Sequence, residues 1–280
     1  MFEKIANGWE LMKSSAQVLR ENTSLLLFPA LSGIACLVVS ASFALPMFFT
    51  GAFTIEANAR QVTHNPLAYV VGFAFYFCSY FVIIFFNSAL VACAVIRFKG
   101  GTPTVNDGFQ AALARMPQIL AWSLVSASVG FLLKIIESRS ERVGQIVSGL
   151  LGLAWSIATF FVVPVIVVEK AGPFEAIQRS MGILRRAWGE AYVGNAGIGL
   201  FVFLLAIVAC APAALGFMIG SGVAIAIGIA VTAFLEIVIA IVSAALHTIL
   251  LGALYVYAAE GRVPYAFDGG VLQSAFARRR

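Results

Sequence analysis

Glu236 is the only acidic residue well inside a long apolar run, which makes it the first candidate for chemistry. Thr232, Ser243 and His247 lie at offsets of four, seven and eleven residues from it, and these offsets return to nearly the same helical direction. An ionisable side chain within a membrane helix is a functional candidate by default, and a desolvated carboxyl suits a proton-coupled step. The spacing therefore predicts an intramembrane polar or proton-binding face.

The depth of Glu236 in a membrane has two interpretations. Val223–Ala258 would be about 54 Å long as one helix, which exceeds a bilayer core of about 30 Å. If the tyrosines near its end mark the cytoplasmic interface, Glu236 lies near the outer boundary and His247 near the midplane. Counted from Gly222, Glu236 instead lies near the centre. We favour the first register, with His247 paired to a backbone carbonyl or a serine in preference to a proton relay.

That register leaves residues 213–235 as surplus apolar chain. The segment is either re-entrant, lining a cavity, or part of a long helix. Gly216 and Gly220 have a spacing that permits close helix contact.

Residue types needed for enzymatic chemistry are scarce elsewhere. Asn87 is a further polar candidate inside an apolar run. Phosphate-binding loops, nucleophile elbows, zinc-protease motifs and paired carboxylates are absent from the sequence. Two histidines, and four cysteines that all fall in apolar runs, offer almost no ligands for a zinc site. We expect no catalytic residues, no metal and no cofactor, and hence no enzyme.

The composition explains this scarcity. Of 280 residues, 61% are hydrophobic and 11% are charged, against roughly 45–50% and about 25% in soluble domains. Each membrane helix needs roughly 20 apolar residues, and the chain supplies six such runs: 25–49, 67–96, 117–136, 143–168, 191–217 and 223–258. The sequence predicts a single all-α, polytopic transmembrane bundle spanning residues 1–280.

Basic residues set the expected orientation. Fourteen of the 18 lysines and arginines lie in the N-terminal segment, the second and fourth connections and the tail at 259–280. The positive-inside rule then places both termini in the cytoplasm. The net charge of +5 indicates contact with anionic lipid and not with nucleic acid.

Amphipathic segments precede the odd-numbered spans. Hydrophobic residues recur every three or four positions in 2–21, 106–116 and 174–188, which predicts interfacial helices and three repeated hairpin units. Asn106 or Asp107 is placed to cap the second of these helices. The expected contacts with lipid or a partner protein are Trp9, Phe174, Arg179, Arg185, Arg186 and Trp188.

Several motifs carry a family resemblance. Trp155–Pro164, Glu169–Pro173, Arg179-Ser180 and Trp188–Glu190 resemble an uncharacterised family of bacterial six-span inner-membrane proteins. The Gly-Pro elbow followed by Ala176-Ile177 is also distantly similar to the non-catalytic membrane domain found beside glycerophosphodiester phosphodiesterases. The resemblance implies the fold and transfers no catalytic residue.

Two functions are compatible with this pattern. The first is a non-enzymatic membrane protein that organises or moves membrane components through contacts with lipid or with a membrane-protein partner. The alternative is a secondary transporter or channel whose pathway lies near spans five and six, with Glu236 or His247 titrating.

Overall fold

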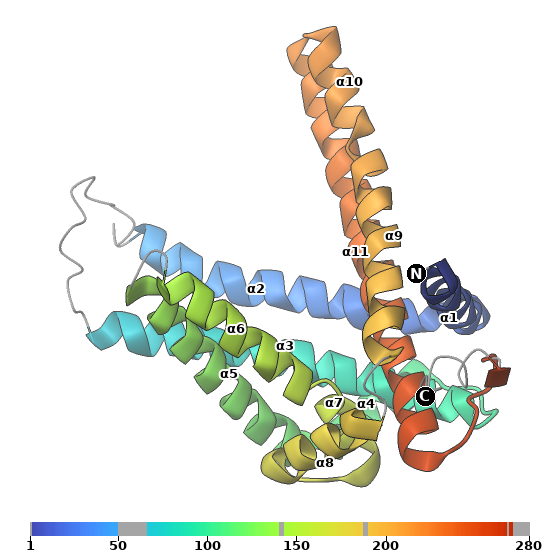
Figure 1. The fold of residues 1–280 in the computed structure, drawn as a ribbon. Helices are drawn as coiled ribbons and strands as arrows, with labels where there is room; N and C mark the ends of the chain where they lie inside the picture. Colours follow the sequence, from blue (N-terminus) through green and yellow to red (C-terminus); the bar gives the residue numbers. More distant parts are fainter. Residues whose placement is uncertain (1, 50–65, 140–142, 187–189, 268, 271–280) are drawn as a thin grey trace. The chain divides into compact units, whose positions relative to one another are not determined.

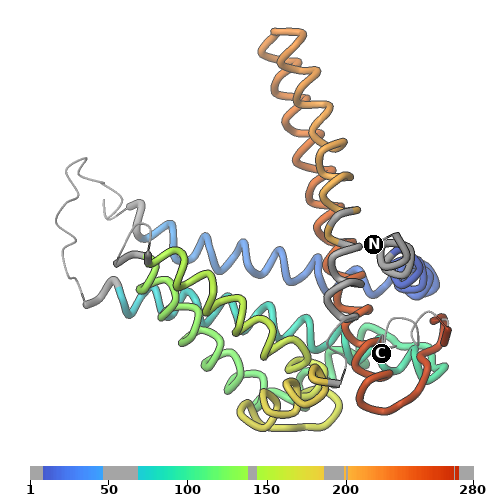
Figure 2. Tube along the Cα trace, viewed as in Figure 1, coloured from blue at the N-terminus to red at the C-terminus, as the bar shows by residue number. Residues whose placement is uncertain are grey.

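The computed structural model describes residues 2–49, 66–139, 143–186, 190–267 and 269–270, and helices dominate this described chain (Figures 1 and 2). No strand occurs among these residues. The α-helices are α1 (Phe2–Glu21), α2 (Leu27–Phe49), α3 (Pro66–Phe98), α4 (Val105–Leu113), α5 (Met116–Arg139), α6 (Val143–Ala158), α7 (Val162–Glu169), α8 (Pro173–Arg186), α9 (Glu190–Ala209), α10 (Ala211–Ile219) and α11 (Gly222–Glu260). A short 3-10 helix, η1 (Thr23–Leu26), precedes α2.

Six helical stretches of the described chain are long and apolar enough to cross a membrane. They are Thr23–Pro46, Tyr69–Phe98, Met116–Glu137, Gly144–Glu169, Phe201–Ile219 and Gly222–Glu260. Helices suit this environment because their backbone groups satisfy one another without water. The prediction of an all-α polytopic bundle with six spans is confirmed.

The fifth and sixth spans form a helical hairpin (Figure 1). Gly220, with a φ of +73°, and Ser221 make its turn, and the Ser221 hydroxyl accepts the N–H of Ala224 at 3.1 Å. After this turn α11 continues for 39 residues, about 58 Å at 1.5 Å per residue. Residues 213–235 therefore belong to α10, α11 and the turn between them. Whether this segment is re-entrant in a membrane stays a prediction.

Close backbone approach holds this hairpin together. A Cβ placed on Gly216 would lie 2.6 Å from the carbonyl oxygen of Ala224, and one on Gly228 would lie 2.5 Å from that of Pro212. These distances are too short for any side chain, so both positions require glycine.

The chain divides into two compact units, which are described separately. Unit 1 comprises Met1–Ala30, Leu90–Gly108 and Gly182–Arg280. Within it α1 packs against α9 and α11. From Trp9 onward, where the structure describes its side chains, α1 buries Leu11, Met12, Ser15, Val18 and Leu19, whereas Glu10, Lys13, Gln17 and Arg20 are exposed. This helix therefore places an apolar face on its own protein.

Unit 2 comprises Leu31–Ala89 and Phe109–Met181. Aromatic rings join α3 to α5, because Phe131 lies edge-on against Tyr69, Phe73 and Tyr76. α5 and α6 pack together, and the stacked rings of Trp122 and Trp155, with centroids 5.7 Å apart, join them. Such aromatic contacts supply directional packing in a bundle that is apolar on all sides.

The fourth span is broken between α6 and α7. The break lies at residues 159–161, three residues before Pro164, whose ring cannot supply a backbone N–H. The fully buried hydroxyl of Ser180, on α8, accepts the N–H of Phe161 at 3.0 Å. A side chain thus takes the place of a helical carbonyl at this point.

The helix that precedes the third span is capped differently from the prediction. Thr104, and neither Asn106 nor Asp107, stands before the first residue of α4, and its hydroxyl accepts the N–H of Asp107 at 3.2 Å. The Asp107 carboxylate in turn accepts the N–H of Thr104 at 2.9 Å. This reciprocal pair is a capping box, and it lowers the pKa of Asp107 because the backbone and hydroxyl of Thr104 both donate to the carboxylate.

α1, α4 and α8 precede the first, third and fifth spans, as the sequence predicts. The three-fold repeat itself stays a prediction.

Candidate functional site

A break in the fifth span faces the predicted polar residues of α11. α9 ends at Ala209 and α10 begins at Ala211, with Cys210 between them. Pro212 has no N–H, so the chain cannot continue the regular hydrogen-bond ladder through this point. The N–H of Ala213 instead donates to the hydroxyl oxygen of Thr232, 3.1 Å away on α11.

Glu236 lies one turn beyond Thr232, at the same break. The Glu236 side chain is half-buried, and the Cys210 thiol of the facing span lies 3.8 Å from its carboxylate oxygen Oε1. A thiol is a weak donor, so this contact stabilises the carboxylate only slightly. The structure thus brings together two residues of the predicted face, Thr232 and Glu236, with the backbone of an interrupted helix.

The other predicted polar residues are not part of this contact. Ser243 and His247 lie farther along α11, and both are half-buried. In the described chain neither side chain makes a hydrogen bond, so the expected pairing of the His247 ring with a carbonyl or a serine is not present there. Asn87 is half-buried in α3, within unit 2, and the hydroxyl of its neighbour Ser88 is buried without a hydrogen-bond partner in the described residues.

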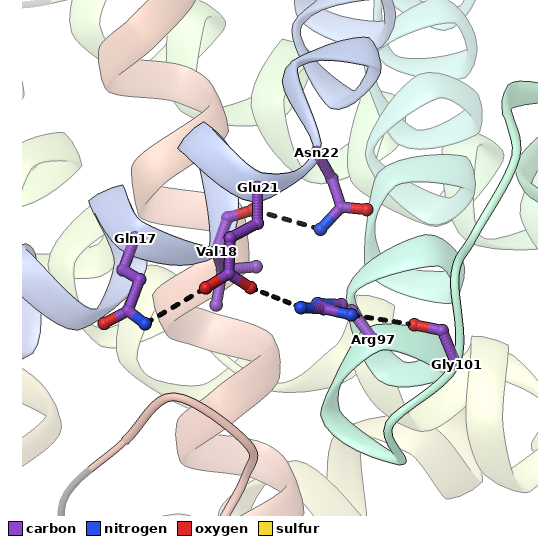
Figure 3. A network of polar contacts seen from close by, with 6 residues as sticks. All are labelled: Gln17, Val18, Glu21, Asn22, Arg97 and Gly101. Atoms are coloured by element: carbon purple, nitrogen blue, oxygen red, sulfur yellow. Dashed lines mark hydrogen bonds and ion pairs between the residues drawn. The ribbon is translucent and has the colours of Figure 1, made fainter.

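A second polar cluster lies in unit 1, around Arg97 (Figure 3). The Arg97 guanidinium pairs with Glu21, the last residue of α1, and its Nη1 donates to the carbonyl of Gly101 at 3.4 Å. The same guanidinium lies 4.7 Å from the ring centroid of Tyr265. Gln17 donates to the second oxygen of Glu21 at 3.0 Å. The cluster joins α1, the end of α3 and the segment after α11.

The electrostatics of this cluster favour the charged form of Glu21. Hydrogen bonds from Arg97 and then from Gln17 hold the pKa of Glu21 below its ordinary value. The Nε of Arg97 is buried and has no hydrogen-bond partner in the described chain. Arg97 is thus positioned by one carboxylate, one carbonyl and one aromatic face.

Sequence reasoning missed this cluster. In the sequence, Arg97 stands out only as one of the basic residues that set the orientation. Glu21 is only part of an amphipathic segment. They are 76 residues apart, so no local spacing links them. The one available signal is that each charge lies at the edge of an apolar or amphipathic helix.

The predicted interfacial residues of α8 have different surroundings. Phe174 is 73% exposed, and Arg185 is exposed as well. Arg179 instead donates through Nε to both carboxylate oxygens of Glu169, each at 3.0 Å, and so joins α8 to the end of α7. Arg186 ends α8, and Trp188 lies outside the described residues.

Trp9 packs within unit 1. The Trp9 ring lies edge-on to the ring of Phe201, with centroids 5.3 Å apart. The Lys13 ammonium lies 5.7 Å from the centroid of the Trp9 ring. The ring is still 42% exposed, so part of its surface stays available for other contacts.

Comparison with known proteins places the chain in one family. A family described as "Family of unknown function (DUF6159)" matches residues 66–265. The chain belongs to this family. The DUF6159 match includes the last five spans, the break at Cys210 and Glu236, whereas α1 lies before it. No curated protein matches the chain. The prediction of an uncharacterised family is confirmed, and the chain is a multi-pass integral membrane protein.

Proposed function

We propose that this DUF6159 protein is a non-enzymatic integral membrane protein that organises or moves membrane components, with α8 as its contact with lipid headgroups. The exposed apolar surface of α8 directly after a membrane span carries the proposal. α8 begins four residues after the fourth span ends at Glu169. Four residues of extended chain reach at most about 14 Å, so the start of α8 stays close to the end of that span.

The side chains of α8 suit the headgroup region. Phe174 and Met181 are 73% and 37% exposed, and Arg185 lies four residues after Met181, near the same helical direction. Apolar side chains beside a cation are typical of helices that bind at the boundary between headgroups and acyl chains. The contact between Arg179 and Glu169 holds the helix near the end of the span. A membrane-protein partner with an acidic, partly apolar surface would suit the same face.

Retention of anionic lipid tests the proposal. The protein is purified from vesicles of phosphatidylcholine and phosphatidylglycerol, and the bound phosphatidylglycerol is measured by mass spectrometry. Arg185→Gln removes one surface cation worth about 1 kcal/mol, so retention falls about fivefold. The double variant Phe174→Ser with Met181→Ser also lowers retention. Gln178→Ser, an exposed polar change on the same helix, is the control, and equal retention in all four proteins refutes the proposal.

The membrane and orientation are part of this proposal. We infer a bacterial inner membrane from the resemblance of the chain to bacterial inner-membrane proteins. We infer that both termini lie in the cytoplasm because the connections that contain Arg97 and Arg179, and the tail that contains Arg262, are basic. Reporter fusions at both termini test it, and an external signal from either one refutes the orientation.

A second candidate, a secondary transporter or channel, is favoured by one observation. Glu236 lies opposite an interrupted helix, and interrupted membrane helices are the usual sites of ion and substrate binding in transporters. Proton flux in proteoliposomes with an imposed pH gradient tests it. Glu236→Gln should abolish the flux, whereas Glu175→Gln, an exposed change on α8, should not.

A further inference from the structure

We propose that Glu236 binds a proton reversibly within the membrane, and that its protonated form donates a hydrogen bond to the backbone carbonyl of Ala209. The inference rests on the membrane-spanning placement of α9, α10 and α11. It does not require that the chain transports a solute.

The break at Cys210 deprives two carbonyls of their helical donors. The carbonyl of Val208 would pair with residue 212, which is a proline and has no N–H. The carbonyl of Ala209 would pair with the N–H of Ala213, but that N–H donates to Thr232. No other backbone hydrogen bond to either carbonyl occurs between α9 and α10 in the described chain. Both acceptors are therefore left without a backbone donor.

Ala209 is the better acceptor for Glu236. Ala209 is only 5% exposed, whereas Val208 is 69% exposed. Its neighbour Cys210 contacts the Glu236 carboxylate directly. An unpaired carbonyl in a membrane is costly because no water is present to satisfy it. A donor supplied from α11 would remove this cost, and Thr232 already makes the matching contact to the N–H of Ala213.

Protonation converts Glu236 into the required donor. An ionised carboxylate only accepts hydrogen bonds, so it cannot satisfy a carbonyl. When one proton from water binds, the carboxylate becomes a carboxylic acid with one O–H, and this O–H donates to the carbonyl oxygen. When the pH rises, the proton returns to water and no other reactant is needed. A metal cation is less favoured, because no group of three or more His, Cys, Asp and Glu gathers among the described residues.

The hairpin sets the depth of the site. Cys210 lies ten residues before Gly220 in the turn, about 15 Å along the helix. This is half of a bilayer core of about 30 Å. If the turn lies at one membrane surface, Cys210 is near the midplane. Glu236, about 21 Å along α11 from Gly222, then also lies within the bilayer core.

Few other titratable groups face Glu236. Cys210 is in contact with it, and α10 contains no titratable residue. Residues 201–209 of α9 contain none either. α1 also packs against α9 and α11. Among its charged residues from Trp9 onward, whose side chains the structure describes, Glu10, Lys13 and Arg20 are exposed and Glu21 pairs with Arg97. On α11 itself His247 lies eleven residues away. A change of protonation at this site is therefore a change at Glu236.

Infrared difference spectroscopy of the full chain in lipid nanodiscs tests the proposal. The carboxylic-acid C=O band is followed while the pH is cycled in H₂O and in D₂O. We expect a band that appears on acidification, shifts in D₂O, is lost in Glu236→Gln and is kept in Glu175→Gln. Gln retains an N–H donor for the carbonyl of Ala209, so this variant should fold.

Thr232→Val separates the proposed site from an isolated carboxyl. Removing the hydroxyl frees the N–H of Ala213 to pair with the carbonyl of Ala209, so the band of Glu236 should shift to the frequency of an acid without that acceptor. Thr248→Val, a change at a buried threonine of α11 that bonds to Ala244, is the matched control and should leave the band unchanged. A band that persists in Glu236→Gln, or that Thr232→Val leaves unmoved, overturns the proposal. These outcomes do not depend on solute transport or on lipid retention.

Discussion

Arg97, in the last turn of α3, forms an ion pair with Glu21, the last residue of α1. Their side chains are only 15% and 30% exposed, and the guanidinium also contacts Gly101 and the ring of Tyr265. A planar cation can make all three contacts at once, which a lysine ammonium cannot do in the same geometry. The pair therefore fastens the first helix and the segment after α11 to the end of the second span.

Arg97→Lys and Arg97→Gln should both lower the thermal stability of the protein, and Gln should do so more. Lys keeps the positive charge but loses the planar guanidinium with its several N–H donors, whereas Gln removes the charge as well. Melting temperature in nanodiscs is the measurement. Lys99→Gln, an exposed change two residues later, is the control, and a loss equal to that of Arg97→Gln would contradict the assigned role.

Stability should also depend on pH through Glu21. Its pKa lies below the ordinary value of 4.5, chiefly because Arg97 donates to the carboxylate. A lowered carboxyl pKa contributes stability that is fully present above the ordinary value and is lost as the pH falls through the lowered one. Melting curves recorded from neutral pH to well below 4.5 should show this decline in the wild type and in Glu10→Gln. Glu21→Gln should lack that component, and an unchanged pH profile would contradict the prediction.

Ser180→Ala should destabilise unit 2 by about 1–3 kcal/mol, because it removes a buried hydroxyl that accepts a backbone N–H. The loss should appear as earlier unfolding in denaturant titrations. Ser148→Ala removes an exposed hydroxyl that bonds to Gln145 and should have little effect. If the two variants unfold alike, the hydroxyl of Ser180 does not stabilise the broken fourth span.

Gly228→Ala should loosen the hairpin of α10 and α11. The added Cβ would lie 2.5 Å from the Pro212 carbonyl oxygen, and a backbone atom cannot yield as a flexible side chain does. Overpacking of this kind costs about 1–3 kcal/mol. Gly222→Ala has nothing within 4 Å of its added Cβ and is the matched control. Protease protection of the hairpin should fall only in Gly228→Ala.

The contacts at the Cys210 break could be predicted from the sequence only in part. Pro212 suggests a kink, and Glu236 stands out as a carboxyl in an apolar run. Neither residue indicates that the freed N–H of Ala213 meets Thr232 across the hairpin. That pairing depends on the register of two packed helices, which Gly216 and Gly228 set through backbone contacts.

The sequence by itself determined the six spans and the helices that precede the odd ones. Both depend on local properties, because the length of an apolar run matches a bilayer and a helix satisfies its own backbone. Only the tertiary structure decided that Arg97 pairs with Glu21, that Arg179 joins Glu169 and that Glu236 meets an interrupted helix. Those contacts join different helices, and in an almost uniformly apolar chain the helix packing, and not the residue pattern, selects which of the few polar groups meet.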